Sequence, residues 1–145
     1  MSVKTNFKNQ TQHYAVTVAR NDAVSATAHV REHTFTVSIQ RGGGEAGPNA
    51  AETLLSALGT CLLTNVQTLA KKMRIELKDA RVKVEGTRRN VPPGLVEIRY
   101  TLYLESDAPP EKLRYLHEKA AEWGTVTNTL ANGVPLEGKV EICQF

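Results

Sequence analysis

The residue with the greatest chemical potential in this sequence is a cysteine inside the segment GPNAAETLLSALGTCLLTN, which runs from Gly47 to Asn65. Cys61 lies at the edge of an apolar stripe in that segment. A thiol acts as a nucleophile only as its thiolate, which needs a nearby cation or another stabilising group, and access for a substrate. A free cysteine is also among the most frequently buried residues, where it behaves as a small apolar side chain. The pattern alone leaves both interpretations of Cys61 open.

Residues that could hold a metal or a nucleotide are not grouped as such sites require. The sequence contains no CxxC or HExxH motif. The loop RGGGEAG lacks the Gly-Lys-Ser/Thr ending with which a phosphate-binding loop holds phosphate and metal. We therefore expect neither a metal nor a cofactor. The four histidines are dispersed, at His13, His29, His33 and His117.

The composition is that of an ordinary globular protein. A chain of 145 residues with 41% hydrophobic and 23% charged residues fits a single domain. Its net charge of +3 comes from scattered Lys and Arg and only 6% of its residues are aromatic, so we expect no nucleic-acid partner. No apolar run approaches the ~18 residues of a membrane span, and the polar start MSVKTNFKNQTQHY lacks a signal-peptide core. These features predict no membrane association and a cytoplasmic location, in which both cysteines are free thiols.

The elements that must position Cys61 follow from periodicity. Alternating apolar residues over 14–20, 24–30 and 33–40 predict three strands in a meander, followed by the flexible loop RGGGEAGPN. A helix is predicted from Asn49 to about Met73, with Asn49 as N-cap and Glu52 completing a capping box. Its apolar stripe contains Leu55, Leu58, Leu62, Val66, Leu69 and Met73.

The C-terminal half predicts a hairpin, two helices and a closing strand. Strands around 82–84 and 95–106 flank the turn VPPG, and a helix opens at the Pro-Pro pair and ends near Gly124. Trp123, at the end of that helix, is predicted to seal the core rather than to line a pocket. A short helix over 125–132 and a final strand over 138–145 complete the chain. This order indicates an α+β domain with mainly antiparallel sheet.

The segment GPNAAETLLSALGTC resembles the stretch that marks the OsmC/Ohr family, the osmotically inducible and organic-hydroperoxide-resistance proteins, and VTNTL over 126–130 strengthens the likeness. The resemblance covers most of the chain. It implies one OsmC-like domain over 1–145, with a strand-rich part over 1–46 and the helices and hairpin over 47–145. It also implies antiparallel sheets around a long central helix that carries the cysteine, in an intertwined homodimer whose active cysteines lie near the interface.

The resemblance further implies a thiol peroxidase. Cys61 matches the family's peroxidatic cysteine, which attacks the O–O bond of an organic hydroperoxide and becomes a sulfenic acid. An arginine and a glutamate assist in the organic-hydroperoxide members. For the arginine, Arg20 and Arg31 are both candidates and Arg20 is favoured. Glu52 lies next to the glutamate position, which is Ala51 here, and its alternative role is that of a helix cap.

The sequence departs from the family pattern at the second cysteine. Gly124 and Thr125 stand where the family has Cys and Pro, and Cys143, expected on the closing strand, matches no family position. We therefore expect a peroxidase that works through Cys61 alone, with an external thiol as reductant. The alternative is an inactive dimer that binds an apolar small molecule at its interface. A third possibility is a purely structural or partner-binding role.

Overall fold

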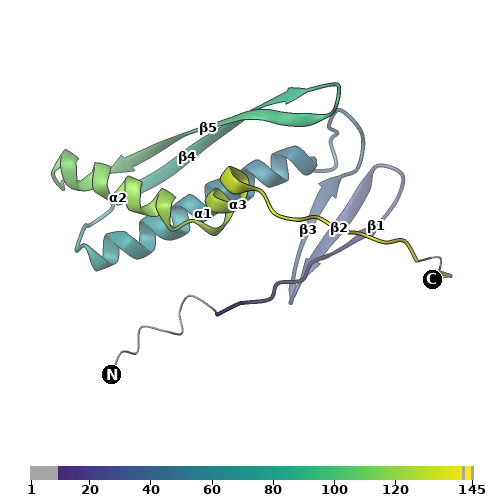
Figure 1. Ribbon diagram of the computed structural model, residues 1–145, viewed down its shortest axis with the longest axis horizontal. Helices are drawn as coiled ribbons and strands as arrows, with labels where there is room; N and C mark the ends of the chain where they lie inside the picture. The colour runs from purple at the N-terminus through teal and green to yellow at the C-terminus, as the bar shows by residue number, and fades with distance from the viewer. Residues whose placement is uncertain (1–9, 142, 145) are drawn as a thin grey trace. The chain divides into compact units, whose positions relative to one another are not determined.

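The computed structural model describes residues 10–141, 143 and 144 (Figure 1). The chain divides into two compact units, Met1–Thr53 and Leu54–Phe145. The boundary falls near the start of the longest described helix, α1 (Ala50–Lys72), which therefore begins in the first unit and continues through the second.

The first unit contains a three-stranded antiparallel sheet in the order β1-β2-β3, which confirms the predicted meander. Its strands are β1 (Thr17–Arg20), β2 (Ser25–Val30) and β3 (His33–Ser38). The turn between β1 and β2 is held by Asp22, whose Oδ1 accepts hydrogen bonds from the backbone N–H groups of Val24 and Ser25. The pKa of Asp22 is lowered by these bonds and by one from the Ser25 hydroxyl, with a smaller effect from the charge of Arg20.

One face of this sheet is apolar and largely exposed within a single chain. Val18, Ala28 and Phe35 form a cross-strand row, and side chains of directly paired residues share one face. The small central residue Ala28 is buried, whereas Val18 is 58% and Phe35 is 44% exposed. The opposite face carries Thr27, Thr34 and other polar residues. The apolar face therefore lacks a cover over its outer strands.

The loop after β3 returns the chain to the start of α1. Gly42 and Gly43 have φ values of 81° and 90°, which few other residues adopt. A Cβ at Gly47 would lie 2.6 Å from the carbonyl oxygen of Thr36, so only glycine allows this close approach to β3. The Ser38 N–H donates to the Pro48 carbonyl at 2.9 Å, which fixes the loop end.

Helix α1 begins at the predicted capping box. The Glu52 N–H donates to Asn49 Oδ1 at 2.9 Å, and the Asn49 N–H donates to Glu52 Oε1 at 3.0 Å, so two N–H groups at the helix start are satisfied reciprocally. Leu58, Leu62 and Val66 of the predicted stripe are buried. The predicted range of Asn49 to Met73 is confirmed to within one residue at each end.

The second unit packs a hairpin and two helices around α1 (Figure 1). The elements are β4 (Asp79–Arg89), β5 (Gly94–Glu105), α2 (Pro110–Glu122) and α3 (Thr125–Asn132). The hairpin runs beside α1, and a Cβ at Gly59 would lie 3.1 Å from Val82 Cγ1, so glycine permits close packing of helix and strand. The buried core joins α1, α2 and the link that follows α1, through Val66, Ala70, Ile75, Leu116 and Ala120.

Two polar contacts tie α2 to its neighbours. The Asn65 side chain of α1 donates to the Ala120 carbonyl at 3.0 Å. The Tyr100 hydroxyl of β5 lies 2.7 Å from His117 Nε2, with the two rings edge to face. Partial burial raises the pKa of Tyr100.

Two predictions about the C-terminal half are wrong. Residues 133–141 form no regular structure, and Val140 is 86% exposed, because an alternating pattern makes a strand only where a neighbouring strand offers hydrogen bonds. Trp123, predicted to seal the core, is 72% exposed. Helix α2 ends at Glu122, so Trp123 leaves the helical stripe that buries Leu116 and Ala120.

Helix α1 is the one described helix that has the length and apolar character of a membrane span, with a mean hydropathy of 1.2 over its best window. This differs from the expectation that no segment would approach that limit. Ser, Thr, Asn and Gln interrupt any unbroken apolar run in α1 yet leave its mean hydropathy high. Core helices of globular proteins pass the same test, so the finding by itself does not assign α1 to a membrane.

Candidate active site

Cys61 is a half-buried free thiol on α1. It follows the buried residues Leu58 and Gly59 and precedes Leu62, so the apolar stripe of α1 holds it at the edge of the core as predicted. Within the described part of the chain its sulfur has no hydrogen-bond or ion-pair partner. The packing of α1 therefore positions the thiol, whereas a cation that would stabilise its thiolate has to come from elsewhere.

The sulfur lies directly against Gly124, the residue between α2 and α3. Gly124 is buried and forms the N-cap of α3. A Cβ at this position would lie 3.1 Å from Cys61 Sγ and 2.5 Å from Thr127 Oγ1. The position that the sequence predicts to lack a second cysteine is therefore in contact with Cys61, although the two residues are far apart along the chain.

Thr127, in the first turn of α3, completes this cluster of three residues. Its Oγ1 is buried and has no hydrogen-bond partner in the part of the chain that the structure describes. The corner that carries it is fixed because the Asn128 N–H donates to the Gly124 carbonyl at 2.9 Å and the Asn128 side chain donates to the Glu122 carbonyl at 3.1 Å. Sequence reasoning noted the VTNTL segment but gave Thr127 no role, since nothing local places it beside Cys61.

The other two predicted site residues lie in the first unit. Glu52 is a capping residue of α1, as described above. Arg20 is exposed at the end of β1 and pairs with Ala26, which in turn pairs with Val37. Arg20 thus shares the apolar face of the sheet. Their association with Cys61 remains a prediction, because Cys61 belongs to the second unit.

Arg31, the other arginine candidate, occupies the tight turn between β2 and β3. It has a φ of 52° and is exposed. Val30 and His33 pair across the turn, so Arg31 is one of the two residues that reverse the chain.

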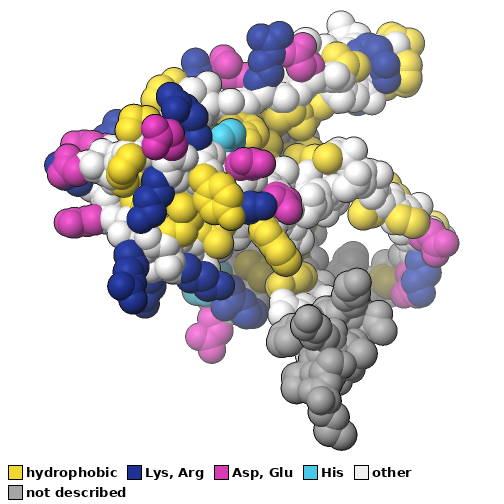
Figure 2. Space-filling view, turned by 60° about the vertical axis from the view of Figure 1, so that its left-hand side comes forward, with side chains coloured by type: hydrophobic (Ala, Val, Ile, Leu, Met, Phe, Trp, Pro, Cys, Tyr) yellow, Lys and Arg dark blue, Asp and Glu magenta, His cyan; other side chains and the backbone are white. Residues whose placement is uncertain are grey.

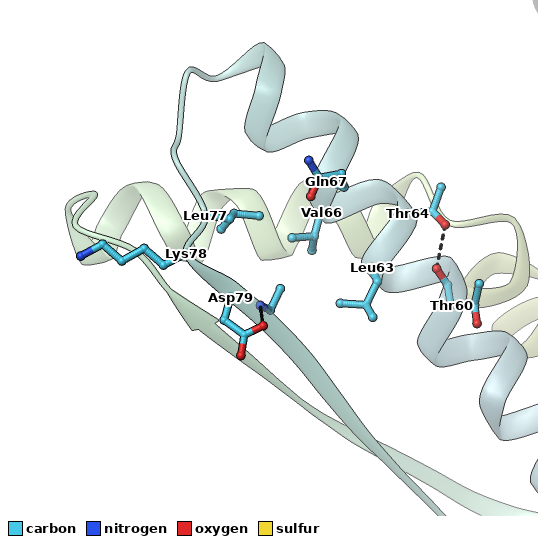
Figure 3. A pocket seen from close by; sticks show the side chains of 9 residues that line it. Thr60, Leu63, Thr64, Val66, Gln67, Leu77, Lys78 and Asp79 are labelled. Atoms are coloured by element: carbon cyan, nitrogen blue, oxygen red, sulfur yellow. Dashed lines mark hydrogen bonds between the residues drawn. The ribbon is translucent and has the colours of Figure 1, made fainter.

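A cavity of about 550 Å³ lies between α1 and the start of β4 (Figure 3). Leu63 and Val66 form part of its apolar wall, and Thr60 and Thr64 lie on the same helix, joined by a hydrogen bond from Thr64 Oγ1 to the Thr60 carbonyl at 2.8 Å. Its described lining includes Thr60 but not Cys61. The cavity is therefore not a pocket around the Cys61 thiol.

The remaining features do not form a second centre. Cys143 is exposed in a segment without regular structure, so its predicted place on a closing strand is wrong. Among the described residues, no group of three or more His, Cys, Asp or Glu side chains could hold a metal ion. Figure 2 shows acidic and basic side chains interspersed on the face that it presents, which offers no continuous basic surface there.

The fold is of the α+β class, with two antiparallel sheets. The longest described helix carries a half-buried cysteine. The chain belongs to the OsmC-like family. The family model described as OsmC-like protein matches residues 42–139, which include α1, the hairpin, α2 and α3.

Solved structures share this fold. An OsmC-like protein from Mycoplasma pneumoniae is 21% identical, with a TM-score of 0.78 over 86% of this chain and 91% of that one. A hypothetical protein from Aquifex aeolicus VF5 is 22% identical, with a TM-score of 0.73 over 85% and 90%. The organic hydroperoxide resistance protein OhrB of Bacillus subtilis is 17% identical, with a TM-score of 0.60 over 84% and 93%. A search of curated protein sequences gave no significant match.

Proposed function

We propose that this protein is a thiol-dependent peroxidase that reduces organic hydroperoxides through Cys61. The observation that carries the proposal is the half-buried free thiol of Cys61 on α1, which lies against Gly124. Membership of the OsmC-like family supports it, as do the solved structures of the same fold that are named hydroperoxide resistance proteins.

The chemistry follows from a single thiol. The Cys61 thiolate attacks the terminal oxygen of the hydroperoxide, the O–O bond breaks, and the leaving alkoxide takes a proton and departs as the alcohol. Cys61 then carries a sulfenic acid. Because Gly124 supplies no second thiol, an external thiol attacks the sulfur and releases water to give a mixed disulfide. A second molecule of that thiol frees Cys61.

Arg20 is our candidate for the cation that stabilises the thiolate, with Glu52 orienting its guanidinium. Arg20 belongs to the apolar sheet face, on which Val18 and Phe35 are exposed. We propose that a second copy of the chain covers this face and forms a homodimer. The arginine would then lie in an apolar interface, where its charge acts strongly. A cytoplasmic location, rich in reduced thiols, suits this cycle.

One observation favours a second candidate function. Trp123 exposes 72% of its surface beside Gly124, as expected if the same region binds an apolar small molecule in a dimer that has lost peroxidase activity along with its second cysteine. A Cys61 thiol that titrates at the ordinary ~8.5 or above would support this alternative. A lower value would support the peroxidase.

The deciding experiment measures oxidation of Cys61 directly. The Cys143→Ser variant is treated with one equivalent of tert-butyl hydroperoxide in the presence of dimedone, and its intact mass is recorded under conditions that keep it folded. We expect one dimedone adduct, located at Cys61 and absent from a Cys61→Ser control. An unmodified Cys61 contradicts the peroxidase.

A further inference from the structure

In the second unit, the Thr127 hydroxyl is unusual in being buried without a hydrogen-bond partner among the described residues. By contrast, the hydroxyl of Thr129, two residues along α3, donates to the Thr125 carbonyl at 2.8 Å. Leaving a buried hydroxyl unpaired costs free energy, so a hydrogen-bond partner for Thr127 Oγ1 has to come from a molecule outside the described chain.

Thr127 and Cys61 border the same small volume. The Cβ position of Gly124 lies 2.5 Å from Thr127 Oγ1 and 3.1 Å from Cys61 Sγ. Any side chain at residue 124 would fill the space that the two atoms share. The glycine therefore does more than omit a second thiol, because a side chain at residue 124 would stand between Cys61 Sγ and Thr127 Oγ1.

We propose that Thr127 Oγ1 donates a hydrogen bond to the oxygen that the hydroperoxide transfers to Cys61. The inference rests on the proposed peroxidase function. After the O–O bond breaks, that oxygen is bonded to Sγ as the sulfenic acid, on the sulfur that lies near Thr127 across Gly124.

The bond matters most in the second half of the cycle. When an external thiol attacks Cys61, the new S–S bond forms as the S–O bond breaks, and the oxygen leaves as water after taking up a proton. A donor on that oxygen draws electrons from the breaking S–O bond and eases its departure. A resolving cysteine would speed disulfide formation by its proximity to Cys61. Here the hydrogen bond from Thr127 speeds the attack of the external thiol and compensates in part for the missing cysteine.

The test separates the two halves of the cycle with matched variants, all carrying Cys143→Ser. Thr127→Val removes the hydroxyl at nearly constant shape, Thr127→Ser keeps it, and Thr129→Val is the control on the same helix. Sulfenic acid is formed with one equivalent of tert-butyl hydroperoxide, and the protein is then desalted. 2-Mercaptoethanol is added, and the mixed disulfide is followed by quenched-flow mass spectrometry.

We expect Thr127→Val to form its sulfenic acid within about twofold of the parent rate and its mixed disulfide about tenfold more slowly, the loss of roughly one good hydrogen bond. Thr127→Ser and Thr129→Val should react at nearly the parent rate. Equal rates of mixed-disulfide formation in Thr127→Val and the parent overturn the role of Thr127 while leaving the peroxidase intact. A parent that forms no sulfenic acid overturns both. If the valine variant does not fold, Thr127→Ala provides the same comparison.

Discussion

At the scale of single residues, the site consists of a sulfur, a missing side chain and a hydroxyl. A Cβ at Gly124 would lie closer than van der Waals contact to both Cys61 Sγ, at 3.1 Å, and Thr127 Oγ1, at 2.5 Å. Residue 124 matters for the chemistry because, as a glycine, it has no side chain and no thiol. In the cycle that we propose, a thiol at residue 124 would capture the sulfenic acid internally, whereas glycine would leave it to a thiol from outside.

Gly124→Cys should restore internal capture. An S–S bond of ~2.05 Å places the Cβ of one half-cystine roughly 3 Å from the other sulfur, and the Cβ of residue 124 would lie 3.1 Å from Cys61 Sγ. In the Cys143→Ser background, we expect stoichiometric hydroperoxide to yield a disulfide between Cys61 and the introduced thiol, detected by non-reducing peptide mapping. The variant should lose about 1–3 kcal/mol of stability, because the new Cβ crowds Thr127 Oγ1.

Thr129→Cys, on the same helix but without this contact, is the control and should form no disulfide. Dimedone labelling that persists at Cys61 in Gly124→Cys would contradict the placement of residue 124 at the sulfur.

At the scale of the elements, the start of α1 and the packing of α2 against it hold this geometry. The capping box fixes where α1 begins, and the buried stripe of Leu58, Leu62 and Val66 sets the side of the helix on which Cys61 lies. The Asn65 bond to Ala120 and the core around Leu116 hold α2 against α1. The α2–α3 corner then carries Gly124 and Thr127 to the sulfur.

Variants at the capping box separate structure from catalysis. Glu52→Gln keeps an oxygen that can accept the Asn49 N–H, so its free energy of unfolding should stay within about 0.5 kcal/mol of the parent. If its carboxylate orients an arginine, as we propose, hydroperoxide should oxidise Cys61 at least about tenfold more slowly. Asn49→Ala should do the reverse, losing about 1 kcal/mol of stability with little change in oxidation rate. Unchanged oxidation in Glu52→Gln would assign this residue to capping alone.

The bond between β5 and α2 predicts a pH dependence. Burial raises the pKa of Tyr100, so the folded state holds its proton more tightly than the unfolded state does. That contribution is fully present below the unfolded pKa of ~10 and is lost as the pH rises further. Tyr100→Phe, which removes the contact with His117 Nε2, should cost about 1 kcal/mol at pH 7.

Urea unfolding of Tyr100→Phe and the parent between neutral pH and pH 11 measures this difference. The difference in unfolding free energy between variant and parent should shrink above about pH 10. The unfolded parent then gains free energy by ionising Tyr100, whereas the folded parent holds the phenol neutral and the variant has no phenol. A difference that stays constant over this range would show that the phenol is not stabilised in its neutral form. Tyr103→Phe, on the exposed face of β5, is the matched control.

Local signals allowed the prediction of elements but not of contacts between them. The cap at Asn49 and the apolar stripe after it predicted helix α1. The alternation of apolar residues predicted strand β5, and both predictions are confirmed because each pattern is local to its own element. The closing strand was predicted from the same kind of alternation and failed, because a strand also needs a partner that local pattern does not supply. The position of Gly124 between Cys61 and Thr127 depends on the packing of α2 on α1, which no short segment of sequence encodes.

At the scale of the whole molecule, several apolar side chains are exposed in the single chain, and this is why we propose a dimer. Val18 and Phe35 are exposed on one sheet face, and Trp123 is exposed beside the candidate site. We propose that a second copy of the chain covers these exposed side chains. In a twofold-symmetric dimer, each chain would cover the apolar sheet face of the other. The Arg20 of each chain would then lie in an apolar interface.

Val18→Asp tests the dimer and its link to catalysis together. The substitution places an unpaired carboxylate on the exposed edge of the Val18–Ala28–Phe35 row, and twofold symmetry would bury it twice, which should weaken association at least about tenfold. Light scattering at micromolar concentration should show a dimer for the parent and a monomer for the variant. Thr34→Asp, on the opposite face of the same sheet, should remain dimeric. If Arg20 acts from this interface, the Val18→Asp monomer should also lose most of its Cys61 oxidation rate, whereas a monomeric parent that still reduces hydroperoxide would show that the second copy is not needed.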